Sequence, residues 1–242
     1  YKNIRPLFND VEVVFHIAAE ARIQPTIKNP ILAATSNVVG TCTVLQCARE
    51  AGTKRVIYSS TSSAYGLKNK IPLAETMPND CLNPYSVTKT SGEQLCKIYT
   101  KLFGLETIIF RYFNVYGERH PLKGQYAPVI GIFLRQKNNG EPMTIVGTGE
   151  QRRDFTHVSD VVSANVLASN LQNKEAVGET FNIGTGTNHS ILEIAKYIGG
   201  EYKFIEPRLG EAQETQANNS KAKKILGWSP TIKVEDWIKN NT

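Results

Sequence analysis

Tyr85 and Lys89 are the side chains of this chain whose types and spacing best suit proton transfer. They stand four residues apart in the segment YSVTK, so a helix presents both on one face. An ammonium group close to a phenol favours the phenolate, and we therefore expect Lys89 to lower the pKa of Tyr85. A tyrosine in that state acts as a general base toward a substrate hydroxyl. The chain has ten tyrosines, so the pair alone is also compatible with an exposed helix surface.

Thr61 lies in a hydroxyl-rich segment, SSTSS at 59–63, which overlaps the end of the run RVIYSS at 55–60. A hydroxyl at this position can hydrogen-bond the same reacting oxygen as Tyr85. A small polar turn is the alternative explanation for so many hydroxyl groups. The two features occur together: a hydroxyl-rich strand end, and then a tyrosine and a lysine one turn apart on the next helix. Their combination indicates an active site more specifically than either feature alone. The combination favours an acid–base site.

Three apolar runs, at 11–17, 55–60 and 105–113, are typical of strands buried on both faces. Helices are expected between them, over about 30–51 and about 84–104. Strands and helices that alternate in this way predict right-handed crossovers and an α/β fold with a doubly wound parallel sheet. Ligands bind such sheets at the carboxyl ends of the strands, which here read HIAAEA, SSTSSAYG and RYFNVYG.

The segment after Tyr116 is polar and rich in glycine and proline, and shorter helices and strands follow it. We expect residues 1–115 to belong to the sheet domain and residues 116–242 to form mainly a smaller, mixed α/β lobe that binds substrate. An apolar run at 179–184 predicts a further buried strand. Residues of about 154–185 are therefore expected to return to the sheet domain.

The composition weighs against two kinds of partner. The net charge is +6, but the positive residues are spread along the chain except for Lys221, Lys223 and Lys224, which suit the exposed face of a short helix. An anionic small substrate explains this excess as well as nucleic acid does, and we expect no nucleic-acid partner. No apolar run approaches the roughly 20 residues of a transmembrane helix, so no membrane partner is expected.

The four cysteines and four histidines show no redox or metal-binding spacing, and there is no CxxC motif. Free thiols in a reducing compartment are the expected state of the cysteines. The sequence therefore predicts a cytoplasmic protein without a metal site.

The chain carries, in order, the motifs HIAA, NVVGT, YSSTSSAYG, NPYSVTK, RYFNVYG, RRDFTHVSDVV, FNIGTG and SKAKKILGW. This series resembles the extended short-chain dehydrogenases/reductases that act on nucleotide sugars, the NAD-dependent epimerases and dehydratases, over nearly the whole chain. Within that family it is most similar to the UDP-hexose 4-epimerases. The resemblance implies a Rossmann-type sheet that binds NAD and a smaller lobe that binds a UDP-sugar.

The resemblance implies catalytic roles for three residues. Tyr85 is the acid/base, Lys89 tunes it and binds the nicotinamide ribose, and Thr61 orients the sugar 4-hydroxyl. The implied reaction is a transient oxidation at C4 with NAD as the hydride carrier. Besides Tyr85 and Lys89, the NAD-binding residues that the resemblance implies are Ile17, Ala18, Ala19, Asn37, Ser59, Ser60 and Phe113. Without the family resemblance, Asn37 is equally explained as an ordinary polar residue of a helix.

On the substrate side, the resemblance implies that Asn114 binds the diphosphate and that Arg153 and Arg208 clamp its phosphates, which suits planar guanidinium groups. Glu211 is implied to bind the uridine ribose. Thr215 occupies the position that gates the space near the sugar C2, where a threonine leaves room for an N-acetyl group. UDP-GlcNAc and UDP-GalNAc are therefore expected substrates, with UDP-Glc and UDP-Gal beside them. Arg153, Arg208 and Glu211 are each also compatible with surface charges.

Ser62 and Ser63 weigh against other reactions of the family. The 4,6-dehydratases carry an Asp-Glu pair at these positions, and the nucleotide-sugar decarboxylases usually keep the Glu. Epimerisation at C4 is therefore favoured over dehydration and decarboxylation. A different nucleotide-sugar enzyme of the family, a decarboxylase, a dehydratase or a C5-type epimerase, stays an alternative. A non-catalytic dinucleotide-fold scaffold or RNA-binding protein is the alternative of another class. It predicts the loss of the tyrosine, lysine or hydroxyl, all of which are present.

The glycine-rich fingerprint GxxGxxG of the family is absent from the sequence. It receives the pyrophosphate on backbone N–H groups and belongs some tens of residues before residue 11. We therefore expect this chain to be an N-terminally truncated part of such an enzyme, lacking about half of the cofactor pocket, and to be inactive or unstable alone. The family also pairs subunits through helices like those expected at 30–51 and 84–103, so a homodimer is expected.

Overall fold

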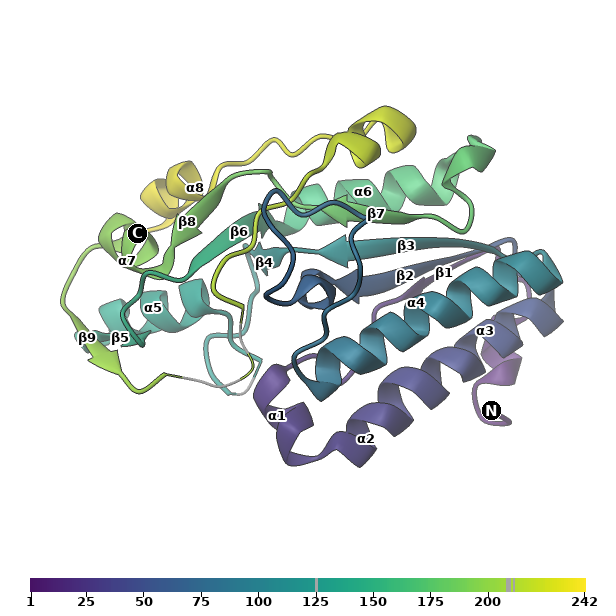
Figure 1. Ribbon diagram of the computed structural model, residues 1–242, viewed down its shortest axis with the longest axis horizontal. Helices are drawn as coiled ribbons and strands as arrows, with labels where there is room; N and C mark the ends of the chain where they lie inside the picture. Colours follow the sequence, from purple (N-terminus) through teal and green to yellow (C-terminus); the bar gives the residue numbers. More distant parts are fainter. Residues whose placement is uncertain (125, 208–209, 211) are drawn as a thin grey trace.

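Within the described residues, four parallel strands form the main sheet, in the order β1-β2-β3-β7 (Figure 1). The computed structural model describes residues 1–124, 126–207, 210 and 212–242. The strands of the sheet are β1 (Val13–His16), β2 (Arg55–Thr61), β3 (Glu106–Tyr112) and β7 (Thr180–Ile183). The predicted α/β class with a parallel, Rossmann-type sheet is confirmed.

Every residue of β2 is buried, as a continuous apolar run predicts for a strand covered on both faces. Successive side chains point to opposite faces, so Val56 and Tyr58 pack in one core and Ile57 in the other. Helix α6 (Val158–Asn170) covers the face of Ile57, and the opposite face is covered by the helix over 30–51 and by α4 (Pro84–Phe103) (Figure 1). The main sheet is therefore the middle layer of three.

Local signals in the sequence explain where these helices begin and end. The helix over 30–51 is continuous and comprises α2 (Pro30–Ala34), the π-helical η2 (Thr35–Val39) and α3 (Gly40–Ala51). Asn83 and Ser86 form a capping box at the start of α4, where each side chain bonds the other's backbone N–H. Gly104 ends α4 with a φ of 72°, a left-handed conformation that glycine adopts without strain.

The helix over 30–51 is long and apolar enough, by length and composition alone, to cross a membrane. This differs from our expectation, which considered only uninterrupted apolar runs. Part of this helix packs in the protein, because Leu45 and Ala48 lie in one core with Cys96 and Tyr99 of α4. A core helix passes the same test of length and composition, so the finding is weak support for a membrane partner.

The second lobe combines small sheets with helices (Figure 1). Strand β6 pairs in parallel with β4 and antiparallel with β8, and β5 pairs in parallel with β9. The elements of this lobe are β4 (Asn114–Tyr116), α5 (Val129–Asn138), β5 (Met143–Val146), β6 (Arg152–His157), β8 (Asn188–Ser190), α7 (Ile191–Ile198), β9 (Tyr202–Ile205) and α8 (Val234–Asn241). The remaining short elements are η1 (Arg5–Phe8), α1 (Ile23–Lys28), η3 (Ser62–Tyr65), η4 (Lys174–Ala176) and η5 (Ala222–Leu226).

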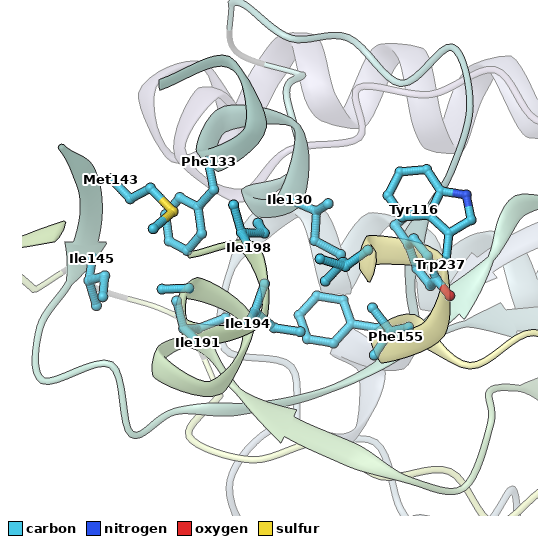
Figure 2. Close-up of a cluster of buried hydrophobic side chains, with 13 residues drawn as sticks. Tyr116, Ile130, Phe133, Met143, Ile145, Phe155, Ile191, Ile194, Ile198 and Trp237 are labelled. Carbon is cyan, nitrogen blue, oxygen red and sulfur yellow. The ribbon is translucent and has the colours of Figure 1, made fainter. Parts of the chain in front are cut away.

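Figure 2 shows the core of the second lobe, where apolar side chains of α5, α7 and α8 meet those of the strands. The ring of Trp237 on α8 meets that of Tyr116 on β4 edge-on, with ring centres 5.3 Å apart. Phe155 of β6 packs in the same core. This core therefore fixes β4 and β6, the strands that carry Asn114 and Arg153.

Candidate active site

A cavity of about 1190 Å³ lies where the carboxyl ends of β2 and β3 face the second lobe. Parallel sheets bind ligands at this edge. The catalytic and substrate residues that line the cavity, as predicted from the sequence, are Thr61, Tyr85, Asn114, Arg153 and Thr215. Arg208 and Glu211, which we also expected there, lie outside the described residues.

Tyr85 lies in the first turn of α4, and Thr61 is the last residue of β2. The capping box at Asn83 starts the helix just before Tyr85 and so fixes the tyrosine at the cavity wall. Burial raises the pKa of Tyr85, while a hydrogen bond with Thr61 and the charge of Arg22 oppose that rise. The two hydroxyl groups predicted to act on one oxygen are therefore neighbours.

Lys89 corrects one of our expectations. Its ammonium nitrogen lies 4.2 Å from the centre of the Tyr58 ring, and the Tyr58 hydroxyl donates to the Lys89 carbonyl oxygen at 3.2 Å. Burial lowers the pKa of Lys89 to about 8, against the charges of Cys96 and Glu93. Lys89 is not among the groups that act on the pKa of Tyr85, which is raised rather than lowered. The expected effect of Lys89 is therefore wrong for this structure, because the ammonium group is turned toward the interior.

Asn37 holds the segment that follows β1. Its side-chain oxygen accepts from the Glu20 backbone N–H at 2.7 Å, and its side-chain nitrogen donates to the Glu20 carbonyl at 3.1 Å. The same nitrogen donates to the Thr88 hydroxyl on α4 at 2.9 Å. Asn37 is buried, and both polar atoms of its side chain are used in this way. It fixes the segment after β1 from the helix over 30–51, and its expected role toward NAD stays a prediction.

The surface beside β1 suits one side of a dinucleotide. Ile17 is 65% exposed, and a hollow of about 520 Å³ is lined by Ala18, Ala19 and the buried His16. Small side chains allow a ligand to approach the main chain closely, and Phe113 lies at the wall of the larger cavity. These residues fit part of NAD. The glycine-rich turn that binds the pyrophosphate in the family is not in the sequence.

Ser59 and Ser60 use their hydroxyl groups within the protein. Ser59 donates to the Tyr112 hydroxyl at 3.3 Å. Ser60 donates to the buried carboxylate of Glu93, which also pairs with Arg111 at 2.7 Å. Ser60 lines the large cavity, but its hydroxyl already has this partner. The roles that we expected for both serines toward NAD stay predictions.

The segment that carries Thr215 lies along β6, the strand that contains Arg153. The Thr215 backbone N–H donates to the Arg152 carbonyl at 3.1 Å, and the Thr215 side chain is buried. The guanidinium of Arg153 donates to the carbonyl of Arg152 at 2.9 Å and to that of Gln213 at 3.2 Å. These bonds hold the segment that carries Thr215 against the strand.

Asp154 is a residue that our sequence reasoning missed. It is fully buried and accepts hydrogen bonds from the Thr185 backbone and hydroxyl at 2.8 and 2.7 Å, from the Gly186 backbone at 2.8 Å and from the Ala217 backbone at 3.0 Å. It thereby joins the loop after β7 to the segment of Thr215. An acid inside the motif RRDFTHV was the available signal, because a buried carboxylate requires hydrogen-bond donors.

Arg22 is a second cavity residue that we missed. It follows the strand-end motif HIAAEA directly, and its guanidinium donates to the carbonyl oxygen of Tyr126. The Tyr126 hydroxyl donates in turn to the carboxylate of Glu20 at 3.3 Å. A cation just beyond a strand end was the available signal.

Residues 2–184 match the model of the NAD dependent epimerase/dehydratase family. The chain belongs to this family. Dependence on NAD is a property of the family, and members of known structure hold NAD beside a UDP-sugar. The resemblance on which our site predictions rest is therefore confirmed.

Several family members are named as UDP-sugar 4-epimerases. A putative UDP-glucose 4-epimerase from Methanocaldococcus jannaschii is 38% identical over 97% of this chain and 79% of its own length. The structure of UDP-glucose 4-epimerase from Thermotoga maritima with UDP-glucose has a TM-score of 0.93 and 33% identity, over 98% of this chain and 79% of that one. UDP-glucuronic acid 4-epimerase from Bacillus cereus, with UDP-glucuronic acid and NAD, has a TM-score of 0.89 and 33% identity, over 98% and 76%. Other relatives are named as a decarboxylase and a 4,6-dehydratase.

Proposed function

We propose that this protein catalyses the NAD-dependent C4 epimerisation of a UDP-hexose or UDP-N-acetylhexosamine. The observation that carries the proposal is the Thr61–Tyr85 hydroxyl pair at the wall of a cavity that also holds Asn114, Arg153 and Thr215. An acid–base group, an orienting hydroxyl and polar groups for a diphosphate are what such a reaction requires. They lie at the edge of the sheet where this fold binds ligands.

In the proposed reaction, Tyr85 takes the proton of the sugar 4-hydroxyl and later returns it to the opposite epimer. Thr61 holds the 4-oxygen beside Tyr85 throughout. When bound, NAD would supply the acceptor and donor of the C4 hydride, and the hexose would be a 4-keto sugar between the two transfers. Asn114 and Arg153 hold the diphosphate, so the hexose can turn while the nucleotide stays in place.

For NAD, we propose that Ile17, Ala18 and Ala19 lie along one side of the dinucleotide and that Lys89 binds the nicotinamide ribose. The flexible four-carbon stem of lysine allows its ammonium group to move from the Tyr58 ring to a ligand.

The lining of the cavity favours epimerisation over the other reactions of the family. The 4,6-dehydratases carry an Asp-Glu pair at the positions of Ser62 and Ser63, and the decarboxylases usually keep the Glu at the second. Both serines line the cavity here. Among the described lining residues, Glu20 is the one acidic residue, and its carboxylate accepts a hydrogen bond from the Tyr126 hydroxyl. Tyr85, Lys89 and Thr61 are all present, which argues against a non-catalytic scaffold.

Thr215 supports N-acetylhexosamines within this proposal. It is buried at the cavity wall, and its short side chain leaves space that a large aromatic residue would fill. UDP-GlcNAc and UDP-GalNAc are therefore proposed substrates, with UDP-Glc and UDP-Gal beside them.

We further propose that the protein acts in the cytoplasm as a homodimer through the helices at 30–51 and 84–103. Exposed apolar side chains occur on both, including Ile31 at 80% and Val39 at 59% on the first and Val87 at 50% on the second. A second subunit would cover these side chains.

The test uses protein expressed from its complete reading frame, and the anomeric proton NMR signals of UDP-GlcNAc are followed with time. We expect UDP-GalNAc to form, and Tyr85→Phe to abolish its formation, with Tyr197→Phe on the surface of α7 as the matched control. Conversion of UDP-Glc alone would keep the reaction and contradict the role of Thr215. No conversion of any UDP-sugar by protein that holds NAD would contradict the proposed function.

A further inference from the structure

Arg22 places a positive charge at the wall of the cavity that contains Thr61 and Tyr85. It lies at the start of α1, and its side chain is half-buried. The guanidinium donates to the carbonyl oxygen of Tyr126, which lies in the segment between β4 and α5. That bond holds the side chain at the cavity. A guanidinium has five N–H donors, so several remain for a ligand.

The arginine side chains that line the cavity come from different parts of the fold. Arg153 comes from β6 in the second lobe, and Arg22 comes from the segment after β1, where its charge acts on Tyr85. Under the proposed function, the diphosphate of the substrate lies with Arg153 and the hexose lies with Tyr85. Arg22 is therefore at the reacting end of the substrate, where a neutral hexose offers no anion.

Among the described residues, Arg22 has no partner in an ion pair. Burial lowers the pKa of Arg22, and the Tyr85 and Tyr126 phenols oppose this only in part. The nearby carboxylate of Glu20 accepts from the Tyr126 hydroxyl at 3.3 Å. A charge removed from water in this way is stabilised by a ligand that brings an anion.

We propose that Arg22 is a specificity residue that selects a UDP-sugar whose hexose carries a carboxylate, a hexuronic acid, over one with a neutral hexose. The planar guanidinium pairs with a carboxylate through two parallel hydrogen bonds, which a hydroxymethyl group cannot form. The inference rests on the proposed function, because it requires the hexose to react beside Tyr85. A carboxylate at C6 and an N-acetyl group at C2 are on different carbons, so the inference is independent of Thr215.

The kinetic test compares kcat/KM for UDP-glucuronate and UDP-glucose. We expect the wild-type protein to prefer UDP-glucuronate. Arg22→Gln lowers kcat/KM for UDP-glucuronate by about 10- to 100-fold, the range expected for the loss of one charge-assisted pair. It lowers kcat/KM for UDP-glucose by less than about 3-fold. Arg22→Lys keeps the charge without the planar fork and restores part of the loss. Lys28→Gln, which removes an exposed charge from the same cavity wall, leaves the ratio of the two substrates unchanged.

A binding measurement separates this inference from the proposed function. Calorimetry with Tyr85→Phe, which retains the cavity but not the base, measures the affinity for both UDP-sugars without turnover. We expect tighter binding of UDP-glucuronate, and loss of that preference in Tyr85→Phe/Arg22→Gln. If the wild-type protein converts neither sugar but this preference is found, the epimerisation proposal fails and the assignment of Arg22 stands. Equal affinities for the two sugars, or an equal effect of Arg22→Gln on both, would overturn the assignment.

Discussion

Thr61, Tyr85 and Lys89 illustrate what residue types and spacing can predict about a site. Thr61 and Tyr85 were expected to meet, because the carboxyl end of one strand and the first turn of the following helix lie at the same edge of a parallel sheet. The direction of the Lys89 side chain was not predictable. It depends on the Tyr58 ring, which belongs to a different element and lies 4.2 Å from the ammonium group.

Two residues whose partners are distant in the sequence, Asp154 and Arg22, were missed. Asp154 bonds the backbone of Gly186 and Ala217, and Arg22 bonds the carbonyl of Tyr126. Neither side chain has a recognisable spacing to its partner. Tertiary structure alone brings these groups together.

The pH dependence of kcat/KM is the prediction that follows from Tyr85. A general base must lose its proton before it acts, so kcat/KM rises as the pH increases through the pKa of Tyr85. Since burial raises that pKa, the rise continues on the alkaline side of neutrality in the free enzyme. Thr61→Val removes a hydrogen bond that lowers this pKa, and it shifts the rise to higher pH. Thr148→Val, at an exposed position, is the control, and an unshifted profile in Thr61→Val would refute the coupling.

At the scale of secondary structure, the elements predicted best are those with strong local patterns. The apolar runs at 55–60 and 105–113 became β2 and β3, and the helix from 84 ends at Phe103 before Gly104, as expected. The sheet of β4, β6 and β8 was not predicted, because Asn114–Tyr116 and Asn188–Ser190 are too short to show a period. Pairing with β6 makes them strands.

Asp154 connects elements of the site, and we predict that Asp154→Asn loosens them. The amide replaces one acceptor oxygen with a donor that faces backbone N–H groups, so the free energy of unfolding falls by about 2–4 kcal/mol. KM for the UDP-sugar should rise more than kcat falls, because the segment of Thr215 shifts. Denaturant unfolding and steady-state kinetics measure both, with the exposed Asp236→Asn on α8 as the control. A variant that is destabilised with KM unchanged would show that Asp154 has only a structural role.

His16, at the end of β1, predicts how stability responds to acid. Burial lowers its pKa to about 4, assisted by the charge of Lys89, against a usual value of 6.5. Between these values the unfolded chain binds a proton that the folded protein does not, so stability is lost as the pH falls from about 6.5 to about 4. Melting temperatures over this range test the effect. His16→Gln should reduce the dependence on pH, and an identical dependence in the variant would contradict this account.

At the scale of the whole molecule, the main sheet and the second lobe each contribute one wall of the cavity. The helix over 30–51 and α4 form one layer beside the main sheet (Figure 1). Both carry exposed apolar side chains. The proposed dimer predicts that Val39→Glu on η2 lowers the molar mass in solution to that of one chain. Val166→Glu, a similarly exposed position on α6 in the opposite layer, should leave it unchanged. Sedimentation equilibrium measures both. A wild-type protein that is monomeric at micromolar concentration would contradict the dimer.

The central claim is that C4 of the sugar is oxidised and reduced again in the cavity beside Thr61 and Tyr85. The most direct measurement is the mass of the product formed from a UDP-hexose that carries deuterium at C4, in ordinary water. The account predicts that the C4 epimer keeps the deuterium, because the hydrogen leaves C4 and returns to it as a hydride without exchange. A product that has lost the deuterium to solvent would indicate removal of that hydrogen as a proton and would contradict the mechanism.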